Sequence, residues 1–138
     1  MEKTLVLIKP DAIANKHIGD IIKRYEDEGF KISAMKLMQM TPKLASIHYA
    51  EHIEKPFYPG LVEFMTSAPI VAMVVTGDNA IARVREINGA TNPANAAEGT
   101  IRKLYAEDGS KNAVHASDST ESAAREISIF FNASEIFD

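Results

Sequence analysis

The sequence Asn112-Ala113-Val114-His115-Ala116-Ser117-Asp118-Ser119 forms a junction around which the other elements of the chain can be arranged. Its first five residues, 112–116, are mostly apolar and predict a short strand with a single histidine. Glu121 stands three residues after Asp118, which is the spacing of a capping box. Ser117 and Ser119 are also residue types that cap helices. We therefore expect a histidine at a strand end, beside a helix N-terminus whose backbone N–H groups attract anions.

The imidazole of His115 is the candidate nucleophile of this junction. Imidazole has an ordinary pKa of about 6.5, so much of it is neutral near pH 7 and able to attack. A nucleophile beside an anion-binding helix end indicates phosphoryl transfer through a phosphohistidine. A lone histidine is more often a structural residue at the edge of a strand, so the assignment depends on the rest of the chain.

Apolar spacing upstream of the junction predicts three further strands. Residues 5–8 form an apolar run that Pro10 ends, and residues 70–75 form another. Between them, apolar residues alternate with polar ones from residue 30 to residue 40, which indicates a half-buried strand with Ser33 on its solvent side.

Apolar residues at helical spacing predict the helices. One helix begins near Ile18 and ends at Gly29, and a second begins at Thr41, which precedes a proline. Further helical segments are expected after Pro59 and along residues 81–87, 100–106 and 119–131. The rest of residues 88–111 lacks a pattern, and a loop this long in a small domain is usually functional.

This order of elements predicts an α+β fold of the ferredoxin-like, split β-α-β type, with an inserted helix pair and a long loop. The length of 138 residues predicts a single domain over residues 1–138. The composition, 46% hydrophobic and 25% charged, is ordinary for a water-soluble globular protein.

Charge and composition also exclude several classes of protein. The net charge of −4 argues against a general nucleic-acid binder, so a polyanionic substrate would need a local cluster of cations. The chain has no cysteine, which excludes disulfide bonds and thiol chemistry. Its N-terminal apolar run is too short for a signal peptide. No stretch has the roughly 20 apolar residues needed to span a bilayer. We therefore expect a cytoplasmic protein without a membrane or a specific nucleic acid as partner.

Several segments of the chain resemble the sequence of nucleoside diphosphate kinases, in the family's order and over nearly the whole length. The matching segments are Lys9-Pro10-Asp11-Ala12, Lys55-Pro56-Phe57-Tyr58, Leu61-Val62-Glu63-Phe64-Met65, Gly89-Ala90-Thr91-Asn92-Pro93, Gly99-Thr100-Ile101-Arg102, and Glu121 to Ile127 after the histidine. Each segment is weak evidence when taken alone, and together they are highly specific.

The resemblance implies a reaction and an architecture. The family has a four-stranded antiparallel sheet and transfers the γ-phosphoryl group of a nucleoside triphosphate to a nucleoside diphosphate. The transfer is ping-pong, through a phosphohistidine that would be His115 here. Mg²⁺ would arrive bound to the nucleotide phosphates, and Asp118 would contact it through a water molecule. No side chain is expected to bind the ion directly. The family is homo-oligomeric, and a hexamer is expected more than a tetramer or a dimer.

The resemblance also implies roles for particular side chains. The expected catalytic residues are His115, Glu126, Ser117, Lys9 and Tyr49, and the expected nucleotide-binding residues are Lys9, Phe57, Arg85, Thr91, Arg102 and Asn112. Arginine is suited to phosphate because its guanidinium group donates two parallel hydrogen bonds. An aromatic ring such as Phe57 stacks on any base. Arg85 is preferred to its neighbour Arg83 because only Arg85 lies six residues before Thr91.

The sequence departs from the family pattern at three positions. Ala116 stands where glycine is common, Leu104 where aspartate is usual, and Gly109 where an apolar side chain often covers the base. None of these changes removes a catalytic group. They leave turnover, affinity and loop stability open, together with the preferred nucleotide.

Two alternatives to a kinase are compatible with parts of the sequence. His48, Glu51 and His52 fit the H-x-x-E-H pattern of a metallohydrolase, although no third protein ligand is evident. A non-catalytic nucleotide-binding module on the same fold is the second alternative, since fold alone does not determine function.

Overall fold

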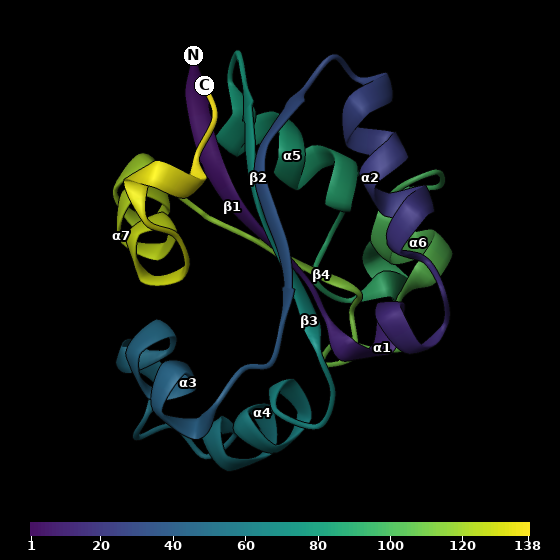
Figure 1. The fold of residues 1–138 in the computed structure, drawn as a ribbon. Coiled ribbons are helices and arrows are strands. Elements are labelled where there is room, and N and C mark those ends of the chain that lie inside the picture. The colour runs from purple at the N-terminus through teal and green to yellow at the C-terminus, as the bar shows by residue number, and fades with distance from the viewer.

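The computed structural model describes all residues from 1 to 138, and its strands form one antiparallel sheet (Figure 1). The strands are β1 (Glu2–Ile8), β2 (Lys31–Met38), β3 (Ile70–Gly77) and β4 (Val114–Ala116). Their order across the sheet is β2-β3-β1-β4, and β1 pairs with both β3 and β4. The four-stranded antiparallel sheet expected from the resemblance is therefore confirmed.

Helices cover both faces of this sheet. They are α1 (Pro10–Ala14), α2 (Ile18–Asp27), α3 (Pro42–His48), α4 (Tyr58–Met65), α5 (Ala80–Asn88), α6 (Ile101–Tyr105) and α7 (Thr120–Phe130). In Figure 1, α7 lies on one side of the sheet and α2 and α6 on the other, while the pair α3 and α4 closes one end. None of these helices is long and apolar enough to cross a membrane.

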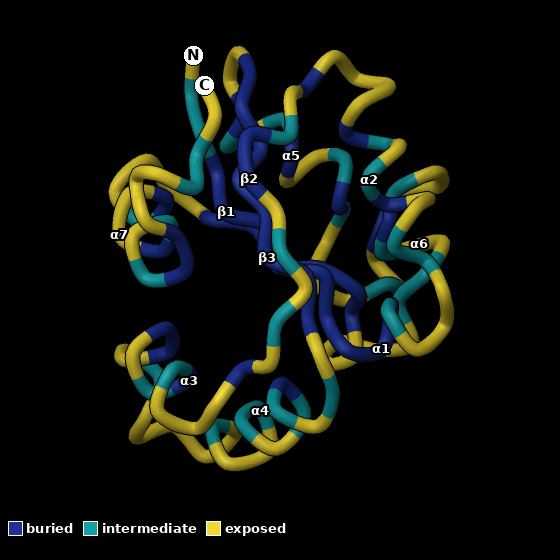
Figure 2. The backbone as a smooth tube through the Cα atoms, viewed as in Figure 1, coloured by how far each residue is buried: buried dark blue, intermediate teal, exposed yellow.

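The two faces of the sheet carry separate apolar clusters, because alternate residues of a strand point to opposite faces. One face of β1 packs Val6 and Ile8 with Tyr25 of α2 and Val84 of α5. The other face packs Leu5 and Leu7 against apolar residues of α3, α4 and α7, among them Ala45, Met65 and Phe130. Figure 2 shows the central strands as the most deeply buried part of the chain.

The strand β2 departs from the simple alternation that the sequence predicts. The register of β2 against β3 shifts between Ile32 and Ala34, which indicates a bulge. As a result Ser33 is buried and lies 2.7 Å from the hydroxyl of Thr76, so its predicted position on the solvent side was wrong. Further along this edge strand, Met35 and Leu37 are 53% and 65% exposed.

The junction around His115 also differs in detail from the prediction. β4 begins at Val114 and not at residue 112, because Ala113 adopts a left-handed conformation with φ of 73°. The capping box of Asp118 with Glu121 was wrong, since the hydroxyl of Ser119 caps α7 by accepting a hydrogen bond from the backbone N–H of Ser122 at 3.0 Å. The strand-to-helix junction itself is present as predicted.

Candidate active site

Two adjoining cavities open beside the end of β1 and along β4, and the smaller one is also lined by residues of α3, α5 and α7. The smaller cavity has a volume of about 260 Å³ and is lined by His115 and by most of the predicted phosphate-binding side chains. The larger cavity has a volume of about 880 Å³ and contains Phe57 in its wall. Both cavities share the residues Lys9, Tyr49, His52, Thr91 and Asn112. A single extended ligand with a charged end and a flat end could therefore occupy both.

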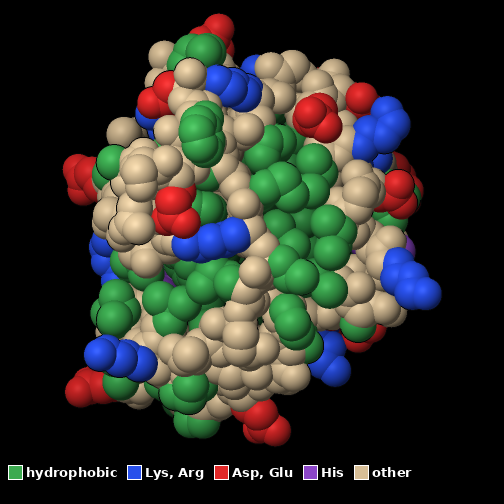
Figure 3. All heavy atoms as spheres, in the orientation of Figure 1, with side chains coloured by type: hydrophobic (Ala, Val, Ile, Leu, Met, Phe, Trp, Pro, Cys, Tyr) green, Lys and Arg blue, Asp and Glu red, His purple; other side chains and the backbone are tan.

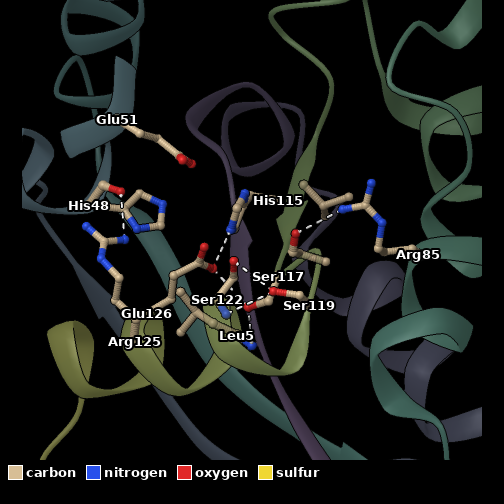
Figure 4. A network of polar contacts seen from close by, with 12 residues as sticks. Leu5, His48, Glu51, Arg85, His115, Ser117, Ser119, Ser122, Arg125 and Glu126 are labelled. Carbon is tan, nitrogen blue, oxygen red and sulfur yellow. Dashed lines mark hydrogen bonds and ion pairs between the residues drawn. The ribbon is translucent and has the colours of Figure 1, made fainter. Parts of the chain in front are cut away.

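His115 is held at one nitrogen of its ring by α7 (Figure 4). Its Nε2 lies 2.8 Å from Oε1 of Glu126, and the Ser117 hydroxyl donates to the same oxygen at 2.9 Å. Burial alone would raise the pKa of Glu126, but the hydrogen bonds and the positive charge that His115 can carry hold it below its usual value. A carboxylate only accepts hydrogen bonds, so the proton of neutral His115 lies on Nε2 and the lone pair of Nδ1 is free.

Ser117 lies between strand and helix and fixes the carboxylate in place. Its Oγ accepts a hydrogen bond from the backbone N–H of Leu5 at 3.2 Å while it donates to Glu126. Because Leu5 belongs to β1, this contact ties the Glu126 carboxylate to one of the two central strands of the sheet. The structure thus places Ser117 in the network around His115 and does not use it as a helix cap.

Lys9 follows β1 directly and is almost fully buried. Its Nζ donates to Oδ1 of Asn112 at 2.7 Å, and the Asn112 amide donates in turn to the backbone carbonyls of Thr91 and Gly109 at 3.3 and 3.2 Å. Burial and the nearby charge of Arg102 lower the pKa of Lys9 to about 8. The long loop and the strand end are therefore joined through one lysine–asparagine pair.

Asp11 is a buried acid for which the sequence predicted no role. Its carboxylate accepts a hydrogen bond from the backbone N–H of Ala113 at 3.0 Å, and the Ala113 carbonyl accepts one from the backbone N–H of Lys9 at 2.8 Å. The left-handed Ala113 is thus held on both sides, which places Asn112 beside Lys9. A buried acid 102 residues from its partner gives no signal in the sequence.

The two predicted phosphate-binding arginines both line the smaller cavity, but they are held differently. Arg102 donates to the backbone carbonyls of Asn112, Gly89 and Val114 at 3.3, 2.9 and 2.8 Å. Burial lowers the pKa of Arg102, which has no acidic partner. Arg85 makes one long contact, of 3.5 Å, to the carbonyl of Ala116. Arg102 therefore also fastens the loop to β4, whereas Arg85 is freer to meet a ligand.

The rejected candidate Arg83 lies elsewhere. It donates to the carbonyl of Glu28 at 2.8 Å and stacks over the ring of Phe30 at 4.3 Å. It lines neither cavity at His115. The spacing argument that favoured Arg85 therefore agrees with the position of the two side chains.

The larger cavity is suited to a flat group. Phe57 is 54% exposed in its wall, together with Leu61 and Phe64. Tyr49 is buried where the two cavities meet, and burial raises the pKa of its hydroxyl. Gly109 also lines this cavity, and a Cβ built on it would meet no atom within 4 Å. The absence of a side chain at Gly109 therefore leaves open space where the family often has an apolar group.

Asp118, Ala116 and Leu104 differ in their position relative to the smaller cavity. The exposed carboxylate of Asp118 lines the smaller cavity, and its hydrogen bond with Ser122 lowers its pKa. Ala116 is buried in the same wall, whereas Leu104 is 50% exposed on α6 and lines neither cavity.

The metallohydrolase hypothesis was wrong. His48 is the last residue of α3, and His52 lies in a separate 3-10 turn, so the two histidines do not share one helix face. The side chain of Glu51 is 83% exposed. No group of three histidine, cysteine or acidic side chains lies close enough to hold a metal ion. His48 instead contacts His115, which the sequence did not predict.

Comparisons with known proteins agree with this geometry. The family model described as nucleoside diphosphate kinase matches residues 2–136. The chain is 54% identical to a nucleoside diphosphate kinase of Rhodopirellula baltica over all of this chain and 91% of that protein. It is 50% identical to one of Thermus thermophilus over 99% of both. Among solved structures, the Aquifex aeolicus nucleoside diphosphate kinase superposes with a TM-score of 0.96 at 47% identity over 98% of both chains. A Halobacterium salinarum nucleoside diphosphate kinase in complex with CDP superposes with a TM-score of 0.96 at 45% identity, over 99% of this chain and 91% of that one.

Proposed function

The chain belongs to the nucleoside diphosphate kinase family, whose members are phosphotransferases with a ping-pong mechanism, and we propose that His115 is the residue that carries the phosphoryl group. One observation supports this assignment most strongly. Glu126 engages Nε2 of His115 at 2.8 Å, which leaves Nδ1 free in a cavity lined by Lys9, Arg85 and Arg102. A non-catalytic binding module is not supported, because the family is one of enzymes and every expected site residue is present.

The proposed reaction has two matched halves. The lone pair of Nδ1 attacks the γ-phosphorus of a nucleoside triphosphate, the bond to the β–γ bridging oxygen breaks, and the nucleoside diphosphate leaves with that electron pair. The proton on Nε2 stays in place, and the Glu126 carboxylate stabilises the positive charge of the phosphorylated ring. A second nucleoside diphosphate then attacks through its terminal oxygen and reverses the step.

The remaining side chains have binding roles in this proposal. Lys9, Arg85 and Arg102 balance the charge of the phosphates in a protein whose net charge is −4, and Thr91 donates to a phosphate oxygen. Lys9 and Asn112 also reach the ribose hydroxyls, and Tyr49 packs between the two cavities. Phe57 stacks on one face of the base.

The family generally depends on Mg²⁺, and the donors of this chain fit a metal that arrives with the nucleotide. No compact set of acidic or histidine ligands is available to hold a bare ion. We propose that Asp118, whose carboxylate is exposed in the smaller cavity, contacts the hydrated ion through water. When bound, the ion supplies positive charge to the phosphate oxygens.

We further propose a homo-oligomer, with a hexamer favoured over a tetramer or a dimer, built from single domains over residues 1–138. The exposed apolar residues Met35 and Leu37 on the edge strand β2 support self-association. Figure 3 shows hydrophobic side chains gathered on the face over which β2 runs in Figure 1. A cytoplasmic location remains a prediction from the sequence.

Mass spectrometry after brief exposure to ATP and Mg²⁺ tests the assignment of His115. We expect one phosphoryl group per chain, stable in alkali and labile in acid as a phosphoramidate is, and absent from His115→Ala. Acid-stable phosphate on Ser117 or Ser119 would instead show that the nucleophile is wrongly assigned.

The proposed placement of the nucleotide can be tested with substrate analogues. Stacking on Phe57 reads only the flat face of a base, so kcat/KM should differ among ATP, GTP, CTP and UTP by less than about tenfold. Loss of the 3′-hydroxyl should cost more, because it strands buried polar groups of Lys9 and Asn112 at about 1–3 kcal/mol. A strong preference for one base, with indifference to the 3′-hydroxyl, would contradict this placement.

A further inference from the structure

His48 is a buried histidine packed directly against His115 (Figure 4). Its ring lies edge-on to the ring of His115, with centroids 5.1 Å apart and planes at 84°. Tyr49 and Phe130 contact other sides of the same ring, with centroids at 4.5 and 5.2 Å, and the residue is only 5% exposed. The ring of His48 therefore forms a fixed aromatic wall beside the nucleophile.

The His48 ring is uncharged when the enzyme works. Neither of its nitrogens has a hydrogen-bond partner, so no acceptor is present to stabilise a proton. Burial, followed by the neighbouring His115, lowers the pKa of His48 to about 3. A neutral ring contributes shape and packing to its neighbour without adding positive charge.

The backbone of His48 is fastened to the helix that also holds His115. The guanidinium of Arg125 on α7 donates to the carbonyls of His48, at 3.4 Å, and of Ile47. Glu126, the next residue of α7, engages Nε2 of His115. Helix α7 thus restrains His115 in two ways. Glu126 engages one atom of its ring directly, and Arg125 holds the backbone of His48, whose ring packs against the ring of His115.

We propose that His48 is a positioning residue that fixes the ring plane of His115 and so aims Nδ1 into the phosphate cavity. A single hydrogen bond at Nε2 fixes one atom of the imidazole but does not fix its plane, whereas an edge-on aromatic neighbour does. The proposal rests on the function proposed above for His115. A misplacement of the reacting atom by about 1 Å can cost about 100-fold in rate, so a small tilt of the ring is enough to matter.

Single-turnover phosphorylation by ATP and Mg²⁺, measured beside the Kd for ADP, tests this proposal. His48→Ala should lower the rate constant of phosphorylation by about 10- to 100-fold while the Kd stays within about twofold. His48→Phe keeps an uncharged ring and should restore the rate to within about threefold of the unmodified protein. His17→Ala is the matched control, because His17 packs on Tyr105 and lines neither cavity at His115, and it should change neither quantity.

A second variant and a spectroscopic measurement test the same proposal if His48→Ala does not fold. Arg125→Ala removes an exposed side chain and should lower the phosphorylation rate about three- to tenfold, and a normal rate in this variant would contradict the proposal. The ¹⁵N spectrum of His115 should show protonated Nε2 in the unmodified chain and mixed or broadened ring signals in both variants. 

Two further results would overturn the proposal: a normal phosphorylation rate in His48→Ala, or equal losses in folded Ala and Phe variants. If the unmodified protein is not phosphorylated on His115, the proposed function fails, and this outcome is visible without any variant at His48.

Discussion

Lys9 is a residue of the site whose pKa the fold lowers into the range in which enzymes are commonly assayed. Burial and Arg102 lower its pKa to about 8, so in the free enzyme its positive charge is present below pH 8 and lost above it. We expect kcat/KM to fall above an apparent pKa near 8 and kcat to fall at higher pH, because bound phosphates stabilise the charged lysine. Profiles from pH 6 to 10 with one nucleotide pair would show this, and a kcat/KM that stays level to pH 10 would contradict it.

Gly109 is the residue at which a side chain should improve binding. A Cβ there meets no atom within 4 Å, and the glycine lines the cavity that holds Phe57. Gly109→Val should lower the Kd for ADP about fivefold, since burying part of an apolar side chain against a base stabilises the complex by roughly 1 kcal/mol. Gly19→Ala, which also has open space but lies on α2, is the control and should leave the Kd unchanged. Weaker binding by the valine variant would count against the proposed position of the base.

For individual residues, the sequence predicted which side chains belong to the site, mainly through the resemblance to the family. The network of His115, Glu126 and Ser117 and the pair of Lys9 and Asn112 were all among the predicted site residues. The sequence did not predict that Arg102 donates to three backbone carbonyls. Nor did it predict that Asp11 accepts a hydrogen bond from Ala113 or that His48 packs against His115. These roles arise from contacts between distant segments, which residue type and spacing do not encode.

At the scale of elements, the end of β1 and the start of β4 form one unit that Asp11 holds together. Asp11→Ala would leave the backbone N–H of the left-handed Ala113 buried without a partner. We expect the free energy of unfolding, measured with urea, to fall by about 1–3 kcal/mol. Asp11→Asn keeps a hydrogen-bond acceptor, so its free energy of unfolding should fall by less. Asp78→Ala is the control: Asp78 is exposed, and its replacement should leave the free energy of unfolding almost unchanged. Equal stability of the two Asp11 variants would show that the acceptor is not what matters.

The existence and type of the elements were predicted better than their ends. The helices beginning near Ile18 and after Thr41 are present, because amphipathic spacing and a capping residue act locally. The helix α1 was not predicted, and three further errors concern the backbone: the early start of β4, the cap at Asp118 and the outward Ser33. The left-handed Ala113 and the bulge in β2 accompany contacts with distant segments, whereas the cap of α7 is a local choice between neighbouring capping residues.

At the scale of the whole molecule, strand order follows from the family fold, but the exposed edge is visible only in the structure. The sequence pattern placed residues 30–40 in a strand without showing that β2 would lie at the edge of the sheet. Edge strands usually carry charged residues that discourage pairing with another chain. β2 instead exposes Met35 and Leu37, with Lys36 between them at intermediate exposure.

We therefore expect copies of the chain to associate through β2, and a charge placed there to weaken the assembly. Leu37→Lys buries a charge in the proposed interface and should shift the mass seen by sedimentation equilibrium at micromolar concentration toward smaller species. Each chain supplies all the proposed catalytic side chains, so phosphorylation of His115 should persist in the smaller species. Ile47→Lys is the matched control, because Ile47 is also an exposed apolar residue, at 45%, but belongs to α3 and not to β2. If the unmodified chain sediments as a monomer, or if both lysine variants reduce the mass equally, β2 is not the interface.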